Sequence, residues 1–61
     1  MEDKKYFIYN VNTGKFYSGI ENKIVEYVDE KENAKVISEA DLGKELMALR
    51  VLGELVEHAE V

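Results

Sequence analysis

The sequence of 61 residues contains no cysteine and only one histidine, His58. Without cysteine the chain has no disulfide framework, and without a cluster of histidine and cysteine it has no candidate structural metal site. A chain of this length buries only about 60% of the surface that its unfolded form exposes. Its stability must come from a well-packed core or from self-association, so we expect one small domain over residues 1–61 that forms a homodimer.

Long apolar runs and basic residues are also scarce. No run approaches the ~20 apolar residues of a membrane span, and Met1–Lys5 leads into a segment too short and too polar for a signal peptide. We expect no membrane partner and a cytoplasmic location, which the absence of cysteine fits. The formal net charge is −5, with 8 Lys and Arg against 13 Asp and Glu. Direct nucleic-acid binding is disfavoured, because it depends on Lys and Arg neutralising phosphates.

Recognisable catalytic and ligand-binding motifs are missing as well. Ser38 is better explained as a helix cap than as a nucleophile, and His58 lies near the end of the chain among glutamates, a poor place for a rigidly held base. The two glycines of Gly14–Gly19 are not followed by the Lys and Ser/Thr of a phosphate-binding loop. The acidic segment Asp29–Glu32 does not follow the pattern of a calcium loop. We therefore predict no catalytic residue, no cofactor, no metal site and no enzymatic activity.

What the chain does contain begins with a β-hairpin. Two aromatic-rich runs flank Asn12–Gly14, a segment that predicts a turn because Gly14 tolerates a positive φ and Asn12 can bond its own backbone. The spacing predicts a first strand over Lys5–Asn10 and a second over Lys15–Ser18, which Gly19 ends.

Neither face of the first strand is polar. Period-two alternation places Phe7, Tyr9 and Val11 on one face, and Tyr6 and Ile8 on the other. Such a strand is either covered on both sides or carries an exposed apolar face, which indicates a partner or a second copy.

Three segments connect the hairpin to a helix. We predict a short third strand from about Lys23 to Val28, a charged turn over Asp29–Asn33 and an extended run over Ala34–Ile37. Ser38 is a typical N-cap, with Asp41 three residues later as in a capping box.

The helix has apolar residues on two sides. Leu42 can pack on Ile37 as a hydrophobic staple across the cap. Leu42, Leu46 and Leu49 recur at i, i+4 and i+7, so they form one stripe that faces the sheet. Gly43, unfavourable inside a helix, predicts a close approach of helix and sheet. On nearly the opposite side lie Ala40, Met47 and Val51.

The C-terminal segment has two interpretations. Gly53 can end the helix as a left-handed cap, with Leu55–Val61 returning as a final strand. Alternatively, Leu52, Val56 and Ala59 keep helical spacing and the helix continues to Glu60. We favour the strand. The predicted fold class is then α+β, with an N-terminal β-hairpin, a short third strand, one amphipathic helix packed on a small antiparallel sheet, and a C-terminal strand.

The surface-forming apolar residues define a candidate interface. Tyrosine is enriched at interface hot spots because it buries a large ring while its hydroxyl stays hydrated, and the second apolar side of the helix needs cover. The predicted partner or dimer interface consists of Tyr6, Ile8, Tyr17, Tyr27, Met47 and Val51.

The order of these features resembles the very small ββαβ proteins of bacteriophages that infect Gram-positive hosts. The resemblance rests on Tyr6–Asn10, Thr13–Gly19, Asn33–Ala40 and Val56–Val61. Some of those phage proteins inhibit bacterial defence, among them anti-CRISPR proteins and inhibitors of Hachiman-type or Thoeris-type immunity. The resemblance implies a phage-encoded inhibitor in the cytoplasm of the host cell, and it assigns no role to any single residue.

Our first hypothesis is a non-enzymatic protein-binding module, a phage inhibitor of a host defence protein that acts as a homodimer. The net charge of −5 supports an alternative, an acidic mimic of nucleic acid that occupies the basic groove of a nucleic-acid-handling enzyme. A third hypothesis is sequestration of a small signalling ligand at a dimer interface.

Overall fold

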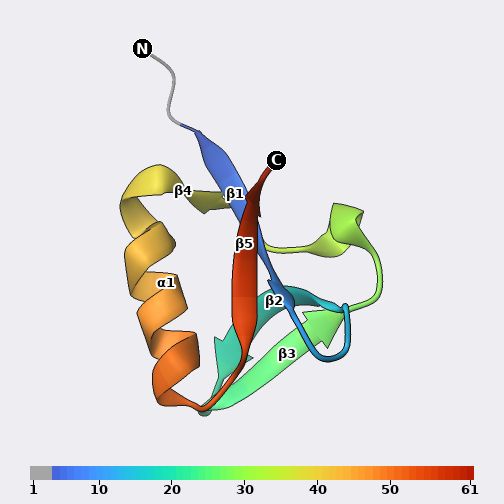
Figure 1. Cartoon of the computed structure of the whole chain (residues 1–61), viewed down its shortest axis with the longest axis vertical. Helices are drawn as coiled ribbons and strands as arrows, with labels where there is room; N and C mark the ends of the chain where they lie inside the picture. The colour runs from blue at the N-terminus through green and yellow to red at the C-terminus, as the bar shows by residue number, and fades with distance from the viewer. Residues whose placement is uncertain (1–3) are drawn as a thin grey trace.

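Five strands and one helix account for most of residues 4–61, the part of the chain that the computed structural model describes. All five strands join a single antiparallel sheet, and the helix packs on one face of it (Figure 1). The predicted α+β class is therefore confirmed. In chain order the elements are β1 (Lys5–Asn10), β2 (Phe16–Glu21), β3 (Ile24–Val28), the 3-10 turn η1 (Lys31–Asn33), β4 (Ile37–Ser38), α1 (Glu39–Val51) and β5 (Val56–Glu60).

The first strand, β1, lies at the centre of the sheet. Along one edge, residues Tyr6–Asn10 of β1 pair with β5. Tyr6 lies opposite Glu60, and Asn10 lies opposite Val56. Its other edge is shared, because β4 pairs with its first residues and β2 with its last ones. β3 extends the sheet beyond β2. β3 and β5 are thus outer strands of the sheet, and the two-residue β4 likewise pairs with one strand only.

The hairpin turn between β1 and β2 is held by a residue of the strand itself. The Oδ1 of Asn10 accepts hydrogen bonds from the backbone N–H groups of Asn12 at 2.8 Å and Thr13 at 3.1 Å. Gly14 has a φ of 75°, which is positive as predicted. The prediction that Asn12 makes the side-chain bond was wrong. Asn10 makes it because its side chain, only 8% exposed, lies under the turn.

The sequence predicted that Gly19 ends the second strand, and this was wrong. The strand continues to Glu21, and the β2–β3 register shifts between Tyr17 and Gly19. Such a β-bulge accommodates an extra residue without ending the pairing. Gly19 has a φ of 154° there. The tight turn into β3 is made by Asn22 and Lys23, whose φ angles of 51° and 65° match a hairpin turn, so the third strand begins at Ile24.

The helix α1 begins after Ser38 and buries the predicted leucine stripe. Leu46 and Leu49 are buried, and Leu42 packs against the same cluster. Gly43 was predicted to mark a close approach of helix and sheet, and this was wrong. Gly43 is exposed, and a side chain added there would meet nothing within 4 Å. α1 falls short of the length and apolarity that a membrane-spanning helix requires, and residues 4–61 contain no other candidate.

Gly53 separates α1 from β5. It has a φ of 84°, and its backbone N–H donates to the carbonyl of Arg50 at 3.0 Å, so the helix ends as predicted. The strand interpretation of the C-terminus is confirmed, and the alternative of a helix to Glu60 is wrong. Strand pairing with β1 satisfies the backbone groups of this segment that point toward β1 and brings Val56 into the core.

The core lies between α1 and one face of the sheet. Its buried members come from β1, β2, β4, β5 and α1, so every element except β3 and η1 supplies at least one: Ile8, Tyr17, Ile37, Leu46, Leu49 and Val56. The opposite face of the sheet is not covered by α1 (Figure 1).

Candidate functional site

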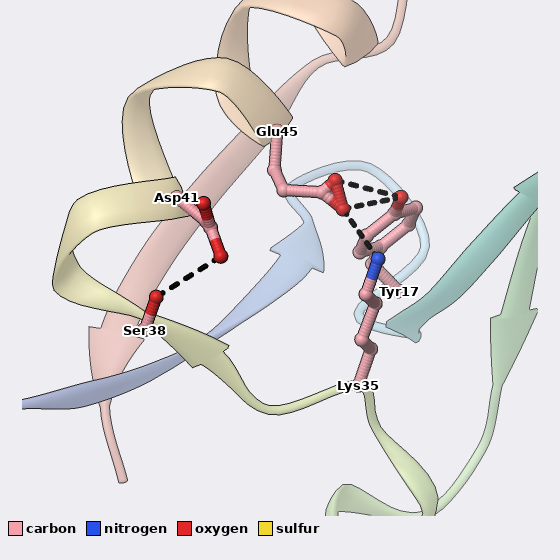
Figure 2. Close-up of polar contacts among 5 residues, drawn as sticks. All are labelled: Tyr17, Lys35, Ser38, Asp41 and Glu45. Carbon is pink, nitrogen blue, oxygen red and sulfur yellow. Dashed lines mark hydrogen bonds and ion pairs between the residues drawn. The ribbon is translucent and has the colours of Figure 1, made fainter.

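The phenol of Tyr17 is the most buried polar group that contacts the helix. Its ring is 1% exposed, and its hydroxyl donates to Oε1 of Glu45 at 3.1 Å. The Nζ of Lys35 forms an ion pair with the same oxygen at 2.7 Å (Figure 2). The backbone N–H of Lys35 also donates to the carbonyl of Tyr17 at 3.0 Å. These three residues tie β2, the segment before β4 and α1 together.

This cluster is not suited to proton transfer at neutral pH. Burial, reinforced by the nearby Glu45 carboxylate, raises the pKa of Tyr17 from 10.0 to about 12. The phenol therefore remains a hydrogen-bond donor. A general acid or base works best with a pKa near the operating pH, so the arrangement stabilises the fold instead.

Ser38 and Asp41 lie beside this cluster at the start of α1. The hydroxyl of Ser38 donates to Oδ2 of Asp41 at 3.1 Å (Figure 2), and no side-chain cap bond to the backbone is present at Ser38. Ser38 occupies the predicted N-cap position but uses its hydroxyl differently. The surface hollow here has a volume of about 230 Å³. Charged residues of both signs line it, with Lys35 and Lys44 facing Asp41 and Glu45.

A second polar cluster surrounds Tyr27. Its hydroxyl donates to Oε1 of Glu54 at 2.8 Å and accepts from Nδ2 of Asn10 at 3.3 Å. Burial raises the pKa of Tyr27. The cluster joins β3 to the β1–β2 turn and to the loop before β5.

The structure divides the predicted interface into core and surface residues. Ile8 and Tyr17 are 0% and 1% exposed, so they pack inside the single chain and cannot contact a partner. Their burial follows from their shared position on the sheet face under α1. Tyr27 is half-buried, in the cluster just described.

The remaining predicted interface residues lie in two places. Met47 and Val51 are 68% and 81% exposed, one turn apart on the outer side of α1. Tyr6 lies on β1 with its ring edge-on to His58 at a centroid distance of 5.7 Å. The sequence therefore identified exposed residues on the helix correctly, but it did not identify one continuous patch.

The face of the sheet opposite α1 carries an aromatic cluster of Phe7, Tyr9 and Phe16. Because Ile8 points into the core, its neighbours Phe7 and Tyr9 point away from the helix. The ring of Phe7 lies 5.7 Å from that of Phe16 and 6.2 Å from that of Tyr9. The Nζ of Lys31 in η1 lies 4.9 Å from the centroid of Phe7. Sequence alternation predicted that Phe7 and Tyr9 share a face, but only the Tyr9–Phe16 register adds the third ring.

Exposed aliphatic residues continue this surface at both ends. Val11 and Leu55, 55% and 61% exposed, meet where the Val11 N–H donates to the Leu55 carbonyl. At the other end a hollow of about 310 Å³ is lined by Phe7, Lys31, Glu32, Val36 and Val61. We call this surface the open face, consisting of Phe7, Tyr9, Val11, Phe16, Val36, Leu55 and Val61. Phe7 is only 9% exposed and forms its floor, Tyr9 and Phe16 are half-buried, and the four aliphatic residues are exposed.

Acidic, histidine and cysteine side chains do not gather into a metal-binding group anywhere in residues 4–61. Comparisons of the chain with protein-family models, with curated proteins and with solved structures find no match. The site must therefore be interpreted from its own geometry.

Proposed function

We propose that this chain is a non-enzymatic protein-binding module that acts as a homodimer and binds its partner protein through the open face. The observation that carries this proposal is the sheet face that α1 does not cover, where the half-buried rings of Tyr9 and Phe16 pack on the buried Phe7 beside exposed aliphatic residues. Aromatic side chains contribute large contact areas at protein interfaces.

The surroundings of the open face suit a protein partner. Val11, Leu55, Val36 and Val61, each more than half exposed, extend the aromatic cluster on the protein surface. Contiguous apolar patches of this kind mark interaction sites in soluble proteins. Glu57, opposite Tyr9 in the sheet and exposed, places a carboxylate on the same face. A partner with an apolar centre and a basic group near it would be complementary.

A narrower role follows from the resemblance to small phage proteins. On that basis we propose that the partner is a host defence protein and that the chain acts as its inhibitor in the host cytoplasm.

The test is capture of partners from a bacterial lysate on the immobilised chain, compared with a double variant, Tyr9→Ser with Val11→Ser. Val11 is exposed and Tyr9 half-buried, so the fold should persist, which circular dichroism checks. We expect the wild type to enrich a protein that the double variant does not. The matched control is Val51→Ser on the outer side of α1, which should capture as well as the wild type.

Two outcomes would count against the proposal. Equal capture by the wild type and the double variant would show that the open face does not bind the partner. A complex that weakens steeply with added salt would instead favour the nucleic-acid mimic, because charge contacts are screened while apolar contacts are not.

A further inference from the structure

The outer edge of β5 presents unpaired backbone groups. The Val61 N–H donates to the Lys5 carbonyl at 2.9 Å, and the Val11 N–H donates to the Leu55 carbonyl at 3.0 Å. Residues 55 and 61 thus point their backbone groups toward β1. Because these groups alternate along an antiparallel strand, Val56, His58 and Glu60 point theirs away from β1, at the border of the sheet.

We infer that this edge pairs antiparallel with β5 of a second copy, with the two-fold axis at His58, so that two sheets join into one. The inference rests on the homodimer part of the proposed function and names the surface that forms it. A two-fold interface must be self-complementary, and the register of β5 can be tested for this property residue by residue.

An axis at His58 pairs every outward backbone group. Val56 then lies opposite the partner's Glu60, and His58 opposite the partner's His58. On the open face, Leu55 lies opposite the partner's Val61. Both side chains are more than 60% exposed in the single chain. In the dimer each would cover apolar surface of the other. The two open faces also become one continuous surface.

Charge placement favours this register over its neighbours. An axis at Glu57 would set two carboxylates directly opposite each other, which is destabilising. An axis at Ala59 would leave the outward groups of Val56 unpaired. With the axis at His58, Glu57 faces the partner's Ala59, no carboxylate faces another, and His58 lies diagonal to the partner's Glu60.

The helix flank above β5 is exposed and carries Met47 and Arg50. Glu45 points toward Tyr17 and Lys35, on the β2 and β4 side (Figure 2). Met47 lies two residues further, about 200° around the helix, and therefore on the β5 side. Arg50 shares this flank, since it lines a hollow with Leu55 and Val56 at the start of β5. A two-fold axis normal to the sheet places both helices on one face, with their Met47 flanks toward each other.

The choice of β5 over β3, the other outer strand, follows from the helix. α1 packs on β1, β4 and β5, so pairing at β5 brings helix surface together as well as strand edges. Pairing at β3 would join strands far from the helix.

Single cysteines test the register cleanly, because the chain has no cysteine of its own. Residues paired across the axis have Cα atoms about 5.5 Å apart, within disulfide range. We expect His58→Cys to oxidise rapidly to a covalent dimer. Diagonal positions lie about 7–8 Å apart, so Glu57→Cys and Ala59→Cys should not. Ile24→Cys, 66% exposed on β3, measures the background of random collisions.

The oligomeric state of reduced protein provides the second readout. Sedimentation of the wild type at high micromolar concentration should give twice the 7.0 kDa of one chain. Met47→Lys should weaken the dimer roughly tenfold, about 1.4 kcal/mol, because it sets like charges against each other across the axis. Ile24→Lys, with the same charge change on β3 at a residue 66% exposed, should leave it unaffected.

Each contrary result has a distinct meaning. A monomeric wild type overturns this inference and the homodimer part of the proposed function together. A dimer in which His58→Cys oxidises no faster than Ile24→Cys, or in which Glu57→Cys or Ala59→Cys is faster, overturns the β5 register alone. Partner capture by the open face is tested separately with the Tyr9 and Val11 substitutions, because these residues take no part in the proposed pairing between two copies of β5.

Discussion

At the scale of single residues, the fold relies on polar side chains that are buried but paired. Within residues 4–61 no buried side-chain nitrogen or oxygen atom lacks a hydrogen-bond partner. Asn10 accepts hydrogen bonds from two backbone N–H groups of the turn and donates one to the Tyr27 hydroxyl. The Tyr17 hydroxyl donates to the Glu45 carboxylate. Leaving such a group unpaired costs about 1–3 kcal/mol, so these residues are poor candidates for chemistry and strong contributors to a defined structure.

The raised pKa of Tyr17 predicts a loss of stability at high pH. Its pKa is 10.0 in an unfolded chain and about 12 in the folded one, so between these values the unfolded state loses the proton first. The contribution is complete below pH 10 and is lost as the pH rises toward 12. Tyr17→Phe should lower the free energy of unfolding by about 1 kcal/mol at neutral pH.

Urea unfolding of both proteins across this pH range provides the measurement. The wild type should lose stability more steeply than Tyr17→Phe, because only the wild type carries the Tyr17 phenol. Parallel curves would show that the Tyr17 phenol titrates normally in the folded chain.

At the scale of elements, glycines at two positions of the helix region have opposite roles. Gly53 adopts a φ of 84° that other residues rarely take, whereas Gly43 has ordinary helical geometry and nothing within 4 Å of an added side chain. The first ends α1 and directs the chain back into β5. Gly43 weakens the interior of α1, and no contact in the chain compensates for it.

Alanine at each glycine should therefore change stability in opposite directions. Gly43→Ala should raise the free energy of unfolding by about 1 kcal/mol, and Gly53→Ala should lower it by about 1–3 kcal/mol. Thermal unfolding followed by circular dichroism measures both. A destabilised Gly43→Ala would indicate that something outside the chain packs closely against this position.

At the scale of the whole molecule, the main core lies on one side of the sheet, under α1, and Phe7 is the buried apolar residue on the other side. Ile8, Leu49 and Tyr17 are the most buried side chains of the main core. Domains of this size have a small margin, roughly 0.05–0.15 kcal/mol per residue. The open face adds contact surface for a partner but little cover for the chain itself.

Truncation of the core should thus unfold a large share of the molecules. Leu49→Ala, at a position 0% exposed, should cost about 2–5 kcal/mol, comparable with the total stability. Val51→Ala, two residues away and 81% exposed, should change it by no more than about 0.5 kcal/mol. Chemical denaturation compares the two. Equal effects would mean that the leucine stripe does not face the sheet.

Local patterns were sufficient for much of this architecture. The bounds of β1, the turn at Gly14, the leucine stripe of α1 and the stop at Gly53 all follow from periodicity or from a required φ, which depend on neighbours within a few residues. Gly19 and Gly43 were misinterpreted because a bulge and a close approach are defined by a second segment, which a local pattern does not contain.

The sequence by itself determined which elements form and which side chains share a face, because backbone geometry repeats every two or 3.6 residues. Only the tertiary structure decided which face is covered. Placing α1 over Ile8 and Tyr17 took them out of the predicted interface, and pairing Tyr9 with Phe16 created the open face. The physical reason is that burial depends on contacts between residues far apart in the chain, so strand register and helix placement must be known before it can be assigned.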